Sequence, residues 1–162
     1  MTKNQQELSD RTSMSVDAFL RAYWKATKPL PIHEFSKRPT EALIQQLTWK
    51  ANRRTRLAPG GNAHVSVRRS KGEVYLDWIA TVADGTGHGS AALDWLCNLA
   101  DRHGVTLRLK IDIECRSRTS SPRFLEAWYK RHGFTVLRKI PGSGVYMTRT
   151  PARAKQKENE DA

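Results

Sequence analysis

A glycine-dense turn is the stretch of this sequence whose residue types and spacing are best suited to chemistry. It lies between a segment with the composition of a strand and one with the periodicity of a helix, and its residues are Gly85, Thr86, Gly87, His88, Gly89 and Ser90. Glycine allows backbone amides to approach an anion, and the unpaired N–H groups and dipole of a helix start attract negative charge. The turn is therefore predicted to hold a phosphate or pyrophosphate group.

Two common phosphate-binding motifs do not fit this turn. A P-loop needs a lysine followed by serine or threonine after its second glycine, and the turn contains no lysine. A dinucleotide-binding fingerprint needs the spacing Gly-x-Gly-x-x-Gly, whereas these three glycines alternate with single residues. A tight turn whose glycines only allow close packing is the structural alternative.

The elements on either side of the turn must position it. Residues 63–69 and 73–82 are predicted to form a hairpin, because a tight turn containing Gly72 separates them. After the glycine-dense turn, an apolar stripe predicts a helix that runs to about His103 and is capped by Gly104.

The following segments complete a sheet. Residues 105–115 alternate strictly between apolar and polar side chains, which predicts a strand buried on one face. Ser121 is a predicted helix cap, and residues 134–137 and 145–148 are predicted to be the last two strands. Residues 73–115 form the unit best suited to parallel pairing, so one sheet with helices packed on it is the economical architecture.

The N-terminal segments are less regular. The spacing of apolar residues predicts a helix that begins after Ser15 and ends before Pro29, and a second helix over residues 40–51. Residues 52–62 are predicted to form a basic loop that is solvated or, alternatively, contacts nucleic acid.

Composition and charge limit the class of protein. The 162 residues, 18.4 kDa, are 38% hydrophobic and contain no apolar run long enough to span a membrane, which predicts one globular, cytoplasmic domain. Two cysteines cannot form a disulfide framework, and no spacing of Cys and His suggests a metal site. The net charge of +12 is spread along the chain and favours an anionic ligand or acidic partner.

Two motifs resemble the GCN5-related N-acetyltransferases, the GNAT family. Residues 84–89 are similar to the family's phosphate loop, Arg/Gln-x-x-Gly-x-Gly/Ala, although Asp84 replaces the usual Arg or Gln. Residues 128–134, Trp-Tyr-Lys-Arg-His-Gly-Phe, resemble the family's Leu-Tyr-x-x-x-Gly-Phe. The two motifs occur in the family's order, and the resemblance covers about residues 63–150.

The resemblance implies a fold and a reaction. The fold would be α/β (α+β): a single mixed, mostly antiparallel sheet with helices on both faces, in one domain over residues 13–150. From their polar and charged composition, segment 1–12 is expected to be flexible and the tail 151–162 to be disordered. Acetyl-CoA would lie where the fourth and fifth strands part, and an amine would attack its thioester directly. The amides of residues 85–90 would hold the pyrophosphate, Tyr129 would be the general acid for the thiolate, and the pantetheine arm would pair with the strand around Ile79, Ala80 and Thr81.

The base that deprotonates the amine is less defined. Glu73 and Asp77 lie four residues apart on one face of a predicted strand, and Asp112 and Glu114 are rivals on the next. Solvated or ion-paired carboxylates are the alternative for each. The acceptor would be a small molecule or a protein with a primary amine, no metal is implied, and a monomer or homodimer is expected.

Two other functional classes stay open. A catalytically inactive GNAT-like module could bind nucleic acid or an acidic protein through its basic surface, and another nucleotide could occupy the turn. Nucleic acid is the less favoured partner, and no membrane association is expected.

Overall fold

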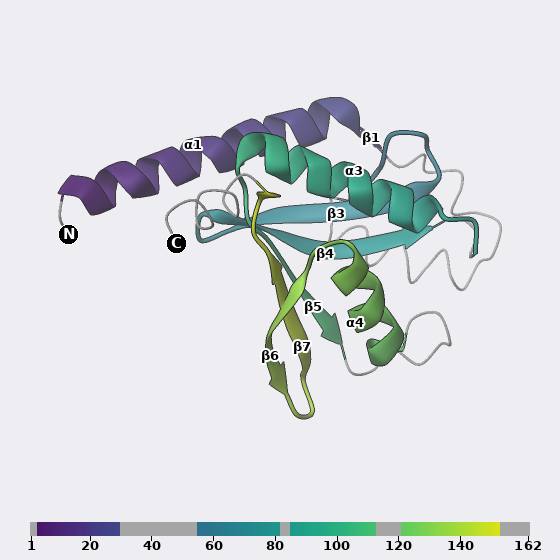
Figure 1. The fold of residues 1–162 in the computed structure, drawn as a ribbon. Coiled ribbons are helices and arrows are strands. Elements are labelled where there is room, and N and C mark those ends of the chain that lie inside the picture. The colour runs from purple at the N-terminus through teal and green to yellow at the C-terminus, as the bar shows by residue number, and fades with distance from the viewer. Residues whose placement is uncertain (1–2, 30–54, 82–84, 113–120, 153–162) are drawn as a thin grey trace.

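The computed structural model describes residues 3–29, 55–81, 85–112 and 121–152 (Figure 1). Within them lie three helices and seven strands. Their bounds, in chain order, are α1 (Lys3–Ala26), β1 (Lys28–Pro29), β2 (Thr55–Leu57), β3 (Ala63–Ser70), β4 (Glu73–Thr81), α3 (His88–His103), β5 (Leu107–Asp112), α4 (Pro122–Arg131), β6 (Thr135–Ile140) and β7 (Gly144–Arg149).

The strands form one mixed, mostly antiparallel sheet in the order β1-β2-β3-β4-β5-β7-β6. Only β4 and β5 run parallel, with α3 as the connection between them, and every other neighbouring pair is antiparallel. The predicted hairpin and the predicted parallel unit over residues 73–115 are both confirmed in the described part of the chain.

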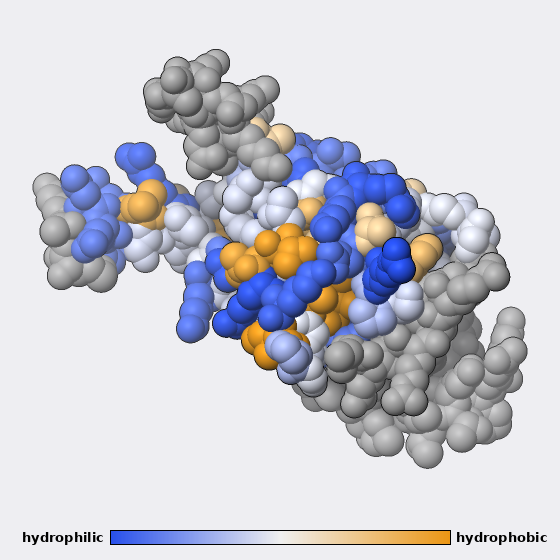
Figure 2. Space-filling model, turned by 60° about the horizontal axis from the view of Figure 1, so that its bottom comes forward, coloured by the Kyte–Doolittle hydropathy of each residue, from blue (hydrophilic) through white to orange (hydrophobic). Residues whose placement is uncertain are grey.

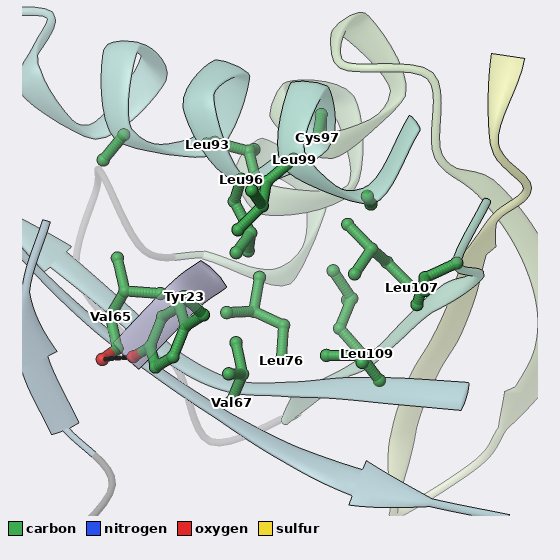
Figure 3. Close-up of a cluster of buried hydrophobic side chains, with 14 of the residues drawn as sticks. Tyr23, Val65, Val67, Leu76, Leu93, Leu96, Cys97, Leu99, Leu107 and Leu109 are labelled. Atoms are coloured by element: carbon green, nitrogen blue, oxygen red, sulfur yellow. Dashed lines mark hydrogen bonds between the residues drawn. The ribbon is translucent and has the colours of Figure 1, made fainter. Parts of the chain in front are cut away.

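One face of the sheet carries the core (Figure 3). Apolar side chains of β3, β4 and β5 meet α3 there, including Val67, Leu76, Leu93 and Leu109, which are at most 3% exposed. The Tyr23 hydroxyl of α1 donates a hydrogen bond to the carbonyl of Val65 at 2.7 Å, which fixes α1 on this face.

The described helices all pack on that face. α1 lies beside α3 (Figure 1). α4 lies on the same face, because its Glu126 pairs with Lys139 of β6, and Lys139 is opposite Val145, which faces the core side of β7. We expected helices on both faces, and the predicted helix 40–51 lies outside the described residues.

The start of the first helix corrects a prediction. α1 begins at Lys3 and not after Ser15, so most of segment 1–12, expected to be flexible, is helical. Its residues 4–10 are exposed, and Gln6 donates to the carboxylate of Asp10 one turn later at 3.2 Å. A helix without a buried face has no apolar period, which is why the sequence pattern missed it. No described helix is both long and apolar enough to cross a membrane.

The basic loop predicted over residues 52–62 contains strand β2 instead. Arg56 of this strand donates to the side chain of Thr27 at 2.6 Å and lies 4.2 Å from the ring centre of Trp24. This arginine joins β2 to the end of α1, so it is held by specific contacts rather than free in a solvated loop.

The ends of α3 and α4 agree with the sequence. Gly104, in the left-handed region with φ of 64°, caps α3, and the Ser121 hydroxyl accepts a hydrogen bond from the Phe124 amide at 3.3 Å. The side chain of Arg149 on β7 forms two bonds with Asp101 of α3, at 2.8 and 2.7 Å, and donates to the carbonyl of His132 at 3.0 Å. The end of β7 is thereby tied to both helices.

Candidate active site

The candidate site begins where β4 and β5 part. Among the described residues the two strands pair only over Val74–Leu107, Tyr75–Arg108 and Leu76–Leu109, and β4 then continues to Thr81 without β5 beside it. Figure 1 shows β3 and β4 running one way and β5, β7 and β6 another.

A β-bulge lies at the same point. Val67 of β3 is opposite Leu76 and Ser66 is opposite Trp78, so Asp77 is the extra residue in β4. A bulge bends its strand and increases the local twist, which here turns β4 away from β5. It also reverses the alternation, because Ile79, like Leu76, lies opposite a buried valine of β3.

The glycine-dense turn follows the free end of β4. Gly85 and Gly87 have φ of 73° and 77°, which is the left-handed region that favours glycine. Gly87 is the N-cap of α3 and provides no side-chain cap, and its carbonyl accepts the first intrahelical bond from Ala91 at 3.0 Å. The first-turn N–H groups of a 16-residue helix therefore have no side-chain cap from this position.

The helix start is packed closely against β4 and α4. A Cβ atom added to Gly89 would lie 3.1 Å from the Thr81 methyl and 3.6 Å from the Trp128 ring. A larger residue here would need the Thr81 methyl to shift by a few tenths of an ångström, so glycine suits the close approach of β4, α3 and α4.

Tyr129, the predicted general acid, lies on α4 and is 8% exposed. Its ring centre is 4.8 Å from that of Trp128 and 5.4 Å from that of Phe134. The indole N–H of Trp128 donates to the hydroxyl of Ser90 at 2.9 Å. The structure thus brings the glycine-dense turn and the residue preceding Tyr129 into direct contact.

The predicted bases are ion-paired. Glu73 at the start of β4 accepts a hydrogen bond from Arg108 at 3.0 Å, Asp77 at the bulge pairs with Arg68 at 2.8 Å, and Asp112 pairs with Lys110 at 2.8 Å. Glu73 is eight residues from Thr81, about 26 Å along an extended strand, so it lies far from the glycine-dense turn. Asp77 is the carboxylate at the point where the strands part, and Glu114 and Asp84 lie outside the described residues.

The outer face of the sheet is polar and aromatic. Arg68 lies 4.2 Å from the ring centre of Tyr75, and Arg138 and Lys110 lie 4.6 and 5.8 Å from that of Tyr146. Burial raises the pKa of Tyr75, an effect that the Arg68 guanidinium partly offsets. Figure 2 turns the lower side of Figure 1 forward, and hydrophilic side chains cross it beside an apolar area.

The described residues contain no candidate metal site, because no group of three or more His, Cys, Asp or Glu side chains is close enough to hold an ion. Cys97 is buried in α3, and burial raises the pKa of its thiol to about 11. It is therefore protonated at neutral pH and unsuited to act as a nucleophile.

Two side-chain contacts between α3 and the end of α4 correspond to no sequence motif and were not predicted. Besides the bond between Trp128 and Ser90, the imidazole of His132 is 2.7 Å from the Asp94 carboxylate. The only signal in the sequence is that both helices repeat these positions at a spacing of four residues.

Neither a family model nor a curated protein matches the chain. Among solved structures, the chain is similar to the ribosomal-protein-S18-alanine N-acetyltransferase from Escherichia coli, with 19% identity, a TM-score of 0.49, and coverage of 76% of this chain and 92% of that one. It is similar to the PaiA N-acetyltransferase from Thermoplasma acidophilum in complex with coenzyme A, with 16% identity, a TM-score of 0.45, and coverage of 68% and 70%.

A third similar structure is described as histone acetyltransferase HPA2 and related acetyltransferase from Corynebacterium glutamicum. It has 21% identity and a TM-score of 0.46, and 94% of each chain is covered. At these values the three structures assign no role to any residue of this chain.

Proposed function

We propose that this protein is a GNAT-like N-acetyltransferase that transfers the acetyl group of acetyl-CoA to a primary amine. The observation that carries the proposal is the parting of β4 and β5 at the Asp77 bulge, next to the uncapped glycine start of α3. The opening between the strands, the anion-binding turn and Tyr129 are the three parts that the resemblance of the two motifs requires.

The residues suit two parts of acetyl-CoA, the pantetheine arm and the pyrophosphate. Past Leu76, alternate residues of β4 direct backbone N–H and C=O groups toward the side where β5 has left, and the resemblance assigns the amides of the pantetheine arm to them around Ile79, Ala80 and Thr81. The amides of residues 85–90 and the positive end of the α3 dipole attract the pyrophosphate.

The reaction needs one proton removed and one supplied. The amine nitrogen forms a bond to the acetyl carbon, the bond from that carbon to sulfur breaks, and the thiolate takes a proton. Tyr129 supplies that proton in our proposal, since phenols and thiols have comparable pKa values. Asp77, directly or through water, is the favoured base because of its place at the bulge, and Glu73 is the second candidate.

The acceptor is limited by charge. A chain with a net charge of +12 repels polycations, so polyamines are disfavoured as acceptors. We propose a neutral amine, an amine that also carries a carboxylate, or an amino group of a protein, and we propose a cytoplasmic monomer or homodimer.

The alternative function is nucleic-acid binding by a catalytically inactive module. The aromatic and cationic pairs on the outer face favour it, because bases stack on aromatic rings and guanidinium groups. Against it, Glu73, Asp77 and Asp112 lie on or beside the same strands and neutralise the nearby cations.

Calorimetric titration separates the two functions. The protein is titrated with acetyl-CoA, with ATP and NAD as controls, and with a single-stranded oligonucleotide at near-physiological salt. Saturable one-to-one binding of acetyl-CoA supports the acetyltransferase. Binding of the oligonucleotide alone, with the strong salt dependence of phosphate contacts, supports the alternative.

A further inference from the structure

Two side-chain contacts of matched spacing hold α4 against the first half of α3. Trp128 donates to Ser90 at 2.9 Å, and His132 lies 2.7 Å from Asp94. Ser90 and Asp94 of α3 are four positions apart, as are Trp128 of α4 and its C-cap residue His132, so both contacts lie on facing sides of the helices. The side chain of His132 is 9% exposed, and its ring makes an edge contact with that of Trp128 at 5.4 Å between centres.

The direction of the contact between Trp128 and Ser90 determines what Ser90 can do. An indole N–H is only a donor, so the serine oxygen must be the acceptor in this bond. The one proton of the serine hydroxyl is then directed elsewhere. Within the described residues the Ser90 hydroxyl makes no second hydrogen bond, and Ser90 lies in the first turn of α3, beside the amides that the proposed function assigns to the pyrophosphate.

We propose that Trp128 is a positioning residue for the acetyl-CoA site: its indole N–H holds the Ser90 hydroxyl as a donor to the pyrophosphate. This inference rests on the proposed function. Trp128 does not touch the reacting atoms in this proposal and acts through Ser90. Its ring also contacts that of Tyr129, so the Trp128 side chain lies between Ser90 at the phosphate-binding turn and the proposed acid.

The kinetic signature follows from where the lost contact acts. A hydrogen bond to the pyrophosphate is the same before and during acetyl transfer, so its loss weakens binding of acetyl-CoA without changing the chemical step. Trp128→Phe keeps an aromatic ring and removes the N–H. We expect it to raise the KM for acetyl-CoA about fivefold and to leave kcat within about twofold, since a bond to a charged group is weakened and not abolished.

A double-mutant cycle tests whether Trp128 acts through Ser90. Ser90→Ala should raise KM by at least as much as Trp128→Phe, and the double variant should match Ser90→Ala, because the indole then has no hydroxyl to orient. Trp95→Phe is the matched control: this tryptophan lies on α3, like Ser90, its ring packs 6.1 Å from that of Tyr23, and its replacement should leave KM unchanged.

The outcomes are distinguishable from failure of the proposed function. Absence of acetyl-CoA binding by the unchanged protein would overturn the proposed function and this role with it. With binding intact, additive effects in the cycle, or an unchanged KM in Ser90→Ala, would overturn the positioning role alone. The Ser90→Ala arm stays decisive even where Trp128→Phe fails to fold.

Discussion

Asp101 and Arg149 join three parts of the fold, and removing either side chain is expected to destabilise the protein. Arg149 forms two bonds to the Asp101 carboxylate, at 2.8 and 2.7 Å, and a third to the carbonyl of His132 at 3.0 Å. Asp101 also accepts a hydrogen bond from the backbone of Ala152 at 2.9 Å. The network links α3, the end of α4 and the end of β7, and the hydrogen bond to Asp101 raises the pKa of Arg149.

The size of the effect follows from burial. The side chains of Arg149 and Asp101 are 12% and 21% exposed, so Asp101→Ala leaves a largely buried guanidinium without its carboxylate. Breaking a fully buried pair costs about 3–5 kcal/mol, and partial exposure reduces this to about 2–3 kcal/mol. For a chain of this length the melting temperature should fall by roughly 5–10 °C.

Urea unfolding followed by circular dichroism measures this free energy. Arg149→Met should cost less than Asp101→Ala, because Asp101 keeps the amide of Ala152 as a donor. The double variant should lose less free energy of unfolding than the two single variants lose together, by at least about 1 kcal/mol, since neither charge is left unpaired. Glu126→Gln is the control: the Glu126 side chain is 15% exposed, but its partners Lys130 and Lys139 are 53% and 60% exposed, unlike Arg149 at 12%, and pairs with exposed lysines contribute less than about 1 kcal/mol. Equal losses for Asp101→Ala and Glu126→Gln would refute the reasoning.

Three further changes have defined outcomes. Tyr129→Phe should lower kcat by about 100-fold or more with little change in acetyl-CoA affinity, measured by calorimetry and initial rates, and an unchanged kcat would remove Tyr129 from the acid role. Gly144→Ala should prevent folding or cost more than about 4 kcal/mol, because its Cβ would lie 2.1 Å from the carbonyl oxygen of Ile111; a soluble variant with a normal melting curve would contradict the packing at β7. Burial raises the pKa of Cys97 to about 11, so the folded state keeps the thiol proton longer than the unfolded chain does. Stability should therefore fall between about pH 9 and pH 11, by about 2 kcal/mol, and Cys97→Ala in a Cys115→Ser background should flatten that part of the profile.

The sequence predicts best where local chemistry and tertiary structure agree. The helix end at Gly104 and the cap at Ser121 depend on residues within one turn of the chain, and the alternation from Val105 onward reflects burial on a single face. The two short strands β1 and β2 could not be predicted, because they exist only through pairing with each other and with β3.

The bulge at Asp77 shows a different limit. Val74 and Leu76 begin an alternation that, continued, would bury Trp78, yet Trp78 is 52% exposed and Ile79 packs against the core. Both residues are apolar, so hydropathy alone does not distinguish the two registers. Only the pairing of Ser66 with Trp78 does. The ion pairs of Glu73 and Asp77 are likewise contacts between strands, which no pattern within one strand contains.

The bulge also leaves backbone groups of β4 available to an occupant of the opening. Backbone N–H and C=O groups that leave a sheet bond to water or to another partner, and leaving them unpaired in a buried place raises the free energy of the fold. Beyond Leu76, no described strand pairs with the side of β4 that faced β5, and that stretch leads directly to the uncapped start of α3. An extended molecule with amide groups along its length and phosphates at one end would supply partners to both. The arm and pyrophosphate of acetyl-CoA have that order, which is why the same observation that opens the sheet supports the proposed substrate.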